Sequence, residues 1–487
     1  MDCGDNRCFN SPGYSGRMKW ELKTVICLLT IWLFSIAALA DETNSDPELT
    51  PSQLPNETKQ QILTWNLYTL IGAHDRAGFT NVLWDGPADA ALIEYAKVRA
   101  RMESTNPAFR RIIFTNASAA IQAGCGDPML KYLALRYSPQ DLHDYQDLAS
   151  KFFEIAKAIH RTTYPSLRKF YADARVLENL KQMTNEAFIF PIRIQTLPHL
   201  TNDLDVALTD NTMPSQEAYD AASFALSVSQ NKFAYQRIYD SLGKLFDTWP
   251  YDYRIWLLAG QANVHMAWDA RGTGWADTVT DEGWRAFNAR LGVARRALEH
   301  AWILNQQDTA IAHEMMTVAL GEGGDRKNME LWFNRAMDLD TNDFEACSHK
   351  LYYLEPKWYG SDDEQISFGR ECVRSQKWGG RVPLILVDAH YGVCNRLDPS
   401  DRDAYWKRPE VWTDITASYE RYFELNPAAI NGYQKYAWYA CEAEQWGKLN
   451  ELLAKIKGAK INYNLFGGED GYNKVLQLAR EHGYKDD

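Results

Sequence analysis

The sequence predicts an all-α protein, an α/α superhelix built from tetratricopeptide-like helical hairpins. Apolar residues recur at helical spacing along most of the chain, and no segment alternates polar and apolar residues over the length of a strand. The second half repeats a pattern of large and small residues at a period of about 34. Hydrophobic residues make up 46% of the chain and charged residues 24%, which is ordinary for a folded protein.

The N-terminus is predicted to direct export. Residues 24–37 form an apolar run, preceded by two lysines and followed by small residues that end at Ala40. This pattern is typical of a secretory signal peptide, here residues 1–40 with cleavage after Ala40. Met18 is an alternative start of translation, in which case residues 1–17 are not part of the protein. An uncleaved membrane anchor is the other interpretation, but the run is short for a span.

The mature chain is expected in the periplasm or outside the cell, and it is acidic. Removing residues 1–40 leaves 48 Lys and Arg against 61 Asp and Glu, a net charge of −13. This charge argues against nucleic acid or anionic lipid as the main partner. No later stretch is long and apolar enough for a transmembrane span. Residues 41–56 are polar with several prolines, and we expect them to be disordered.

Helical patterns fill the N-terminal region, residues 57–200. Two glycines end one helix, and Asp127 with Pro128 begins the next, because aspartate caps a first turn and a missing N–H costs nothing there. The stretch from Gln195 to Ser215, with two prolines and a polar cluster, is the predicted domain boundary. The helices expected here are 57–73, 89–102, 109–123, 129–137, 141–161 and 166–185.

The repeat region is predicted at residues 216–460, and residues 461–487 are expected to form a tail with a short helix. Each repeat has a large residue, a small one three positions on and a leucine after another three. Two copies lie 35 positions apart, namely Leu298, Ala301 and Leu304, then Phe333, Ala336 and Leu339. A third copy places Tyr422 at the small position, which departs from the pattern.

An earlier copy ending at Trp249 precedes Leu304 by 55 positions, about 21 more than one period. The excess includes the segment Trp268–Trp284, WDARGTGWADTVTDEGW, which connects two helical patterns. Two glycines end the first pattern, and Thr280 is a good N-cap for the second. We therefore predict an insertion into the repeat array near residues 268–284, and such insertions often carry binding.

Two interpretations of this segment stay open. In the structural one, Trp275 and Trp284 pack under the connection while Arg271 pairs with Asp277. In the functional one, the segment is a recognition surface, because Trp and Arg most often carry binding energy at interfaces. The predicted binding residues are Trp268, Arg271, Trp275, Asp277 and Trp284.

Two stretches carry a family resemblance. The run ARGTGWADTVTDEGW and the later KLYYLEPKWYGS, Lys350–Ser361, resemble the uncharacterised bacterial family catalogued as domain of unknown function 4034. The segment Gly124–Tyr132 is similar to part of the same proteins. The resemblance covers roughly residues 60–460. It implies a helical-repeat fold and a Gram-negative bacterial source, and it implies no catalytic residue.

The cysteines give one disulfide prediction. Five cysteines remain after cleavage, and no Cys-x-x-Cys motif occurs, which disfavours thiol redox chemistry and structural zinc. If residues 358–360 form a hairpin turn, Cys347 and Cys372 lie at similar distances from it on antiparallel helices. We predict a disulfide between them, since export permits one. The alternative is that all five are small buried hydrophobic residues.

The sequence gives little support to catalysis, and neither a metal nor another cofactor is predicted. His265 and Asp269 share a helix face, where a hydrogen-bonded pair is favoured over a metal ligand or general base. His313 and Glu314 lack the second histidine of a zinc protease motif, and no nucleophile elbow or phosphate loop occurs. Residues 355–360 form a second aromatic connection, which either packs its turn or contributes to a ligand groove.

These observations favour an exported binding protein or scaffold that recognises a peptide or partner protein. In this hypothesis the array provides a groove, Arg271 recognises a carboxylate, and Trp268 and Trp275 make apolar contacts. A hydrolase acting on cell-envelope glycans, built on a helical solenoid, is the second hypothesis. A structural spacer within an envelope assembly is the third.

Overall fold

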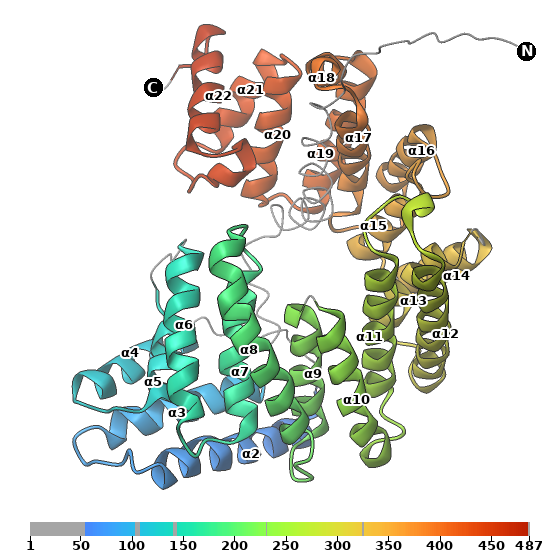
Figure 1. Ribbon diagram of the computed structural model, residues 1–487. Helices are drawn as coiled ribbons and strands as arrows, with labels where there is room; N and C mark the ends of the chain where they lie inside the picture. Colours follow the sequence, from blue (N-terminus) through green and yellow to red (C-terminus); the bar gives the residue numbers. More distant parts are fainter. Residues whose placement is uncertain (1–53, 103–107, 140–143, 230, 324–325, 486–487) are drawn as a thin grey trace, which may run out of the picture. The chain divides into compact units, whose positions relative to one another are not determined.

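The computed structural model describes residues 54–102, 108–139, 144–229, 231–323 and 326–485. The predicted signal peptide and nearly all of the lead-in at 41–56 lie outside these residues. Every regular element of the described chain is a helix, and no strand occurs among them, so the all-α prediction is confirmed (Figure 1).

The α-helices are α2 (Asn56–Arg76), α3 (Asp85–Arg99), α4 (Ala108–Gln122), α5 (Pro128–Arg136), α6 (Tyr145–His160), α7 (Ser166–Leu180), α8 (Glu186–Ala207), α9 (Ser215–Ser229), α10 (Lys232–Thr248), α11 (Tyr253–Arg271), α12 (Asp281–Leu304), α13 (Thr309–Glu322), α14 (Arg326–Leu339), α15 (Phe344–Tyr353), α16 (Asp362–Arg374), α17 (Ile385–Arg396), α18 (Arg402–Trp406), α19 (Pro409–Leu425), α20 (Ile430–Glu442), α21 (Trp446–Lys455) and α22 (Glu469–Glu481). Short 3₁₀ turns include η2 (Ala276–Thr278) and η5 (Tyr463–Phe466).

The described chain forms two compact units, one within Asn44–Gly360 and one within Ser361–Asp487. The predicted repeat region at 216–460 therefore does not form one continuous body. In the first unit, α7, α9, α11, α13 and α15 contact one another in succession, and each is joined to a neighbouring antiparallel helix. This is the arrangement of a helical-repeat protein, in which each hairpin buries its apolar face against the next.

Local sequence explains where several helices begin. Asp127 accepts a hydrogen bond from the backbone N–H of Met129 at 2.7 Å, with Pro128 at the first helical position of α5. Thr280 accepts from the backbone N–H of Gly283 at 3.0 Å and so caps α12. Gly272, with φ of 71°, ends α11 in a conformation that favours glycine. Both predicted N-caps are confirmed.

The predicted boundary at Gln195–Ser215 is wrong at its first half, because α8 runs through it and contains Pro191 and Pro198. Proline removes a backbone donor and leaves a carbonyl without its usual partner. The packing of α8 against α7 and α10 thus outweighs the cost of the two prolines.

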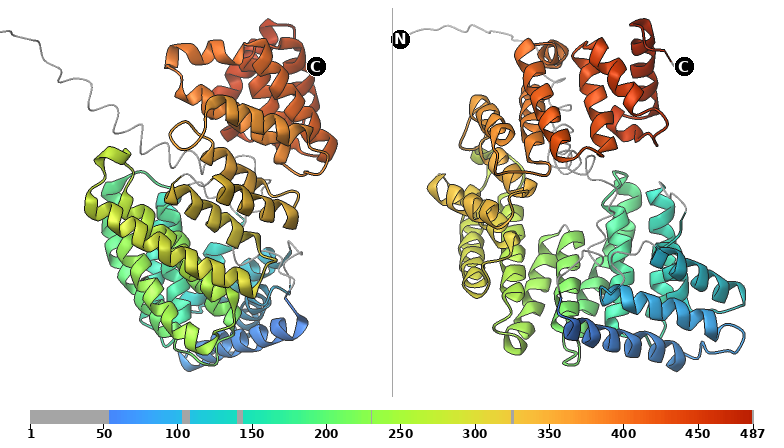
Figure 2. Two further views of the ribbon diagram at one scale, coloured as in Figure 1. Left: turned by 90° about the vertical axis from the view of Figure 1, so that its right-hand side faces the viewer. Right: turned by 180° about the vertical axis from the view of Figure 1, so that it is seen from behind.

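The predicted insertion near 268–284 proves to be mostly longer helices. The helices α11 and α12 have 19 and 24 residues, whereas α13 and α14 have 14 each, which accounts for 15 of the 21 extra residues. The connection at 272–280, with nine residues against three between α13 and α14, accounts for most of the rest. Figure 2 shows this long hairpin beside α13 and α14.

A buried polar network ties the N-terminal helices to the stack. Arg99 of α3 forms an ion pair with Glu217 of α9, and both side chains are buried. Asn66 of α2 donates to Glu217 at 2.7 Å and accepts from Arg168 of α7 at 2.6 Å. Because a buried carboxylate is costly unless it is paired and hydrogen-bonded, this network fixes how α2 and α3 pack on α7 and α9.

The second unit contains α16 to α22, and it explains the aberrant repeat copy. Tyr422 of α19 occupies the position where the other copies have alanine. A Cβ atom on Gly432 of α20 would lie 2.7 Å from the ring of Tyr422, so the missing side chain of glycine makes room for the large one. The short helix expected in the C-terminal tail is present as α22.

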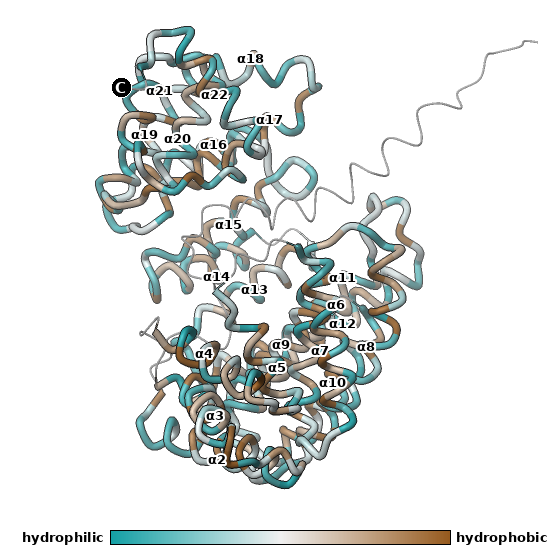
Figure 3. Tube along the Cα trace, turned by 90° about the vertical axis from the view of Figure 1, so that its left-hand side faces the viewer, coloured by the Kyte–Doolittle hydropathy of each residue, from teal (hydrophilic) through white to brown (hydrophobic). Residues whose placement is uncertain are grey.

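None of the helices that the structure describes has the length and apolar character needed to cross a membrane. Figure 3 shows apolar and polar residues interspersed along the chain. Helix α6 buries one face, whereas α7 and α13 bury most of their residues.

The predicted disulfide between Cys347 and Cys372 is wrong, since both residues are buried thiols. Cys347 lies inside the first unit, with its Sγ 3.6 Å from Sδ of Met337, and Cys372 is buried in α16 of the second. The prediction assumed one hairpin around residues 358–360, but a boundary between units falls there. The alternative interpretation, small buried hydrophobic residues, describes both cysteines.

Candidate binding site

Arg271, at the end of α11, lies among three tryptophans. Its guanidinium carbon is 5.9 Å from the ring centroid of Trp268, 5.7 Å from that of Trp284 and 5.5 Å from that of Trp358. These distances are within the range of cation–π attraction. The guanidinium also donates to the carbonyls of Gly272 at 3.0 Å and Gly274 at 3.1 Å. Arg271 therefore holds the connection from its base.

The rings themselves pack edge to face. Trp268 lies 5.7 Å from Trp358 and 5.1 Å from Phe287, and Trp284 lies 5.6 Å from Phe287. Such T-shaped contacts are favourable because the ring edge is positive and the face negative. We call Trp268, Arg271, Trp284, Phe287 and Trp358 the aromatic cluster. The aromatic cluster contains residues from both aromatic connections, 268–284 and 355–360.

The predicted ion pair between Arg271 and Asp277 does not form in the described structure. Arg271 is instead engaged by backbone carbonyls and rings, and Asp277 is exposed in η2. The structural interpretation is therefore correct in its packing of Trp284 and wrong in its ion pair.

Trp275 does not pack under the connection, contrary to the structural interpretation. Its side chain is 74% exposed, and the whole stretch 272–278 is exposed around it. The loop is nevertheless compact: the Thr278 hydroxyl donates to the carbonyl of Trp275 at 2.7 Å, and a Cβ atom on Gly274 would lie 2.4 Å from that hydroxyl oxygen. An exposed tryptophan thus sits on a tight turn above the aromatic cluster.

His265 and Asp269, expected to pair on α11, form no hydrogen bond with each other in the described structure. His265 stacks on Tyr235 of α10, with ring centroids 4.8 Å apart and planes 13° from parallel. The predicted hydrogen-bonded pair is therefore wrong.

A row of histidines and carboxylates lies on α13 and α15. His313 Nε2 is 2.7 Å from Asp343, and its Nδ1 is 3.6 Å from Glu345. The ring of His349 stacks on that of His313 at 5.7 Å. No short sequence motif reveals this row, because the residues of α13 lie 30 or more positions from those at α15; only the 34-residue period could have aligned them.

The pKa values of the two glutamates of this row are shifted in opposite directions. Burial raises the pKa of Glu314, and the nearby His349 and His313 only partly oppose that effect. The pKa of Glu345 is lowered, first by His349, whose Nε2 lies 3.9 Å away. The pKa of Glu314 on α13 is thus raised while that of Glu345 on α15 is lowered.

Compared with models of protein families, the sequence matches none, and no curated protein matches it. The resemblance to domain of unknown function 4034 therefore stays a prediction. The function has to be argued from the site itself.

Proposed function

We propose that this protein is an exported binding protein that recognises a peptide or partner protein through Trp275. The observation that carries this proposal is a tryptophan, 74% exposed, on a turn whose base is fixed by the aromatic cluster. Tryptophan contributes most to interface hot spots. A turn already held in one conformation loses little entropy when a partner binds.

The groups around Trp275 suggest what kind of partner fits. Asp277, Asp281 and Glu282 are exposed on the same connection and the first turn of α12, and the chain carries a net charge of −12. A partner with an apolar pocket for the indole and basic residues at its rim is complementary to this surface. Trp268, Arg271 and Trp284 then support the turn, and they do not contact the partner.

The test is affinity capture from an extract of the native host, quantified by mass spectrometry. Trp275→Ala is compared with Phe233→Ala, which removes another exposed aromatic residue, 71% exposed, from α10. We expect partners captured by the wild type to persist with Phe233→Ala and fall by about 30-fold or more in affinity with Trp275→Ala, the effect of losing a hot spot of about 2 kcal/mol. Equal capture by all three proteins would refute the proposal and favour the structural spacer.

Export is a separate part of the proposal. It is supported by the apolar run and small residues that precede Ala40. N-terminal sequencing of the protein purified from its host should find Asp41 first; an intact residue 1 or 18 would refute cleavage.

A glycan hydrolase is the second candidate, and it is favoured by the opposite directions in which the pKa values of Glu314 and Glu345 are shifted. A glycosidase needs one carboxyl group that stays protonated and one that stays ionised. Glu314→Gln should abolish release of reducing ends from purified cell-wall glycan, and Glu330→Gln on α14 serves as the control. No release by the wild-type protein would remove this candidate.

A further inference from the structure

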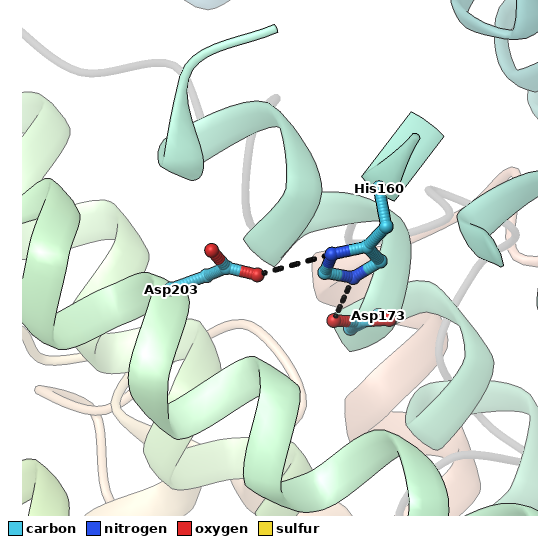
Figure 4. A group of neighbouring side chains, drawn as sticks. All are labelled: His160, Asp173 and Asp203. Atoms are coloured by element: carbon cyan, nitrogen blue, oxygen red, sulfur yellow. Dashed lines mark hydrogen bonds and ion pairs between the residues drawn. The ribbon is translucent and has the colours of Figure 1, made fainter. Parts of the chain in front are cut away.

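Four side chains that can bind metals gather where α6, α7 and α8 meet. His160 ends α6, Asp173 lies on α7, and His199 and Asp203 lie on α8. Figure 4 shows the His160 ring between the two carboxylates, with one ring nitrogen facing each. One ligand atom each from His160, Asp173 and Asp203 lies within 4.8 Å of the others.

The two sides of the His160 ring differ. Nε2 donates to Asp173 at 2.9 Å, which is a normal hydrogen bond. Nδ1 lies 3.6 Å from Oδ2 of Asp203, which is too long for one. Two atoms that each bind one metal ion at about 2.1 Å in tetrahedral geometry are about 3.4 Å apart. The Nδ1–Asp203 separation therefore fits an ion between them with little movement of either side chain.

The hydrogen bond to Asp173 has a defined place in such a site. A histidine that binds a metal usually donates its other ring N–H to a carboxylate, which fixes the tautomer and the ring orientation. With the proton on Nε2, the lone pair of Nδ1 is available on the side of Asp203. Asp173 is thus a positioning residue, and its side chain is only 5% exposed.

His199 is the candidate for a third ligand, and its ring has to turn toward the ion, since it is not among the three residues whose ligand atoms lie within 4.8 Å of one another. It precedes Asp203 by four positions on α8, so both side chains lie on one face of the helix. Its ring centroid is 4.9 Å from that of His160. His199 is exposed and His160 is 22% exposed, which gives an ion access from solvent and leaves a fourth position for water.

The charges around His160 favour a proton on its ring as the alternative to a metal ion. Burial raises the pKa of both Asp173 and Asp203, so the two carboxylates need a positive charge nearby. Without a metal, the hydrogen bond to Asp173 raises the pKa of His160 and so favours its protonated form. Lys169 also lies near Asp203 and weakens the attraction for a cation. A divalent ion and a proton on Nδ1 therefore exclude each other.

We propose that His160, through Nδ1, together with His199 and Asp203 binds one divalent transition-metal ion, with Zn²⁺ the best fit to two imidazoles and one carboxylate. Two histidines and one carboxylate are ligands of this class of ion, whereas Ca²⁺ and Mg²⁺ prefer oxygen alone. The ion would clamp the end of α6 to α8 in the first unit.

The test is titration of the full chain, stripped with a chelator, with Zn²⁺ in a calorimeter. We expect one ion per chain, loss of binding with His199→Ala and with Asp203→Asn, and 10- to 100-fold weaker binding with Asp173→Asn. Co²⁺ bound to the wild-type protein should give the visible absorption of a tetrahedral site. Asp173→Asn should change this spectrum if Asp173 orients the His160 ring, and should leave it unchanged if Asp173 has a purely structural effect. His265→Ala, an exposed histidine that stacks elsewhere, is the control.

Circular dichroism of each variant shows whether it folds. If Asp203→Asn does not fold, His199→Ala still tests the proposal, because His199 is exposed. Absence of Zn²⁺ binding, or binding that His199→Ala leaves intact, would overturn the proposal and leave a protonated His160 between two carboxylates.

Discussion

Arg271 allows a quantitative test of the aromatic cluster. Replacing it with alanine removes three cation–π contacts at 5.5 to 5.9 Å, close to the outer limit of that interaction, so each is assigned about 0.5 kcal/mol. It also removes two hydrogen bonds to exposed carbonyls, about 0.5 kcal/mol each. Allowing for solvent around this half-buried side chain, the loss is about 2 kcal/mol.

The destabilisation should be confined to this segment, because the cluster fixes only the connection and the adjoining helix ends. About 2 kcal/mol corresponds to a roughly 30-fold larger population of the opened segment. Hydrogen exchange followed by mass spectrometry should therefore show about 30-fold faster exchange in peptides spanning 268–284. Among the amides affected is that of Gly272, which donates to Trp268 at 2.9 Å.

Arg285→Ala is the matched control, since this exposed arginine of α12 lies one residue after the cluster's Trp284. It should change exchange by no more than about twofold. Arg271→Lys should give an intermediate effect, because lysine keeps the charge but lacks the planar group that reaches both carbonyls. Equal exchange in Arg271→Ala and Arg285→Ala would refute the cluster as the support of the Trp275 turn.

Three further predictions concern stability. Gly260→Ala should lower the free energy of unfolding in urea by about 1 to 3 kcal/mol, because its Cβ would lie 2.5 Å from Leu298. Gly243→Ala is the control: nothing lies within 4 Å of its Cβ, so it should raise that free energy by about 0.5 to 1 kcal/mol. No change in Gly260→Ala would contradict the tight packing of α11 on α12. Glu217→Ala should cost about 3 kcal/mol, the lower end for breaking a buried ion pair, because Asp220 remains 3.7 Å from the Arg99 guanidinium; a loss under 1 kcal/mol would show that the ion pair is dispensable. Burial opposes protonation of His313, but its hydrogen bond to Asp343 and the neighbouring glutamates raise its pKa above 6.5 in the folded state. The protonated form therefore stabilises the fold fully below about pH 6.5, and this stabilisation is lost as pH rises through the folded pKa; Asp343→Asn should flatten that decline above about pH 6.5.

Local features of the site were predictable because their causes are local. The end of α11 at Gly272 and the cap of α12 at Thr280 follow from backbone conformation and one side-chain hydrogen bond each. The fate of Arg271 was not predictable in the same way. The sequence suggested Asp277 as its partner, but the ring of Trp358, from the distant connection 355–360, lies beside it in the folded chain.

The amino-acid sequence by itself determined that this protein is all-α and built of helical hairpins, because apolar spacing, caps and the 34-residue period act within one or two turns or between adjacent repeats. Tertiary structure alone decided that α8 continues through two prolines, that the compact units divide at Gly360, and that His160 meets Asp203. These outcomes depend on packing between segments far apart in the chain, where burial free energy outweighs local preference and no spacing in the sequence records the contact.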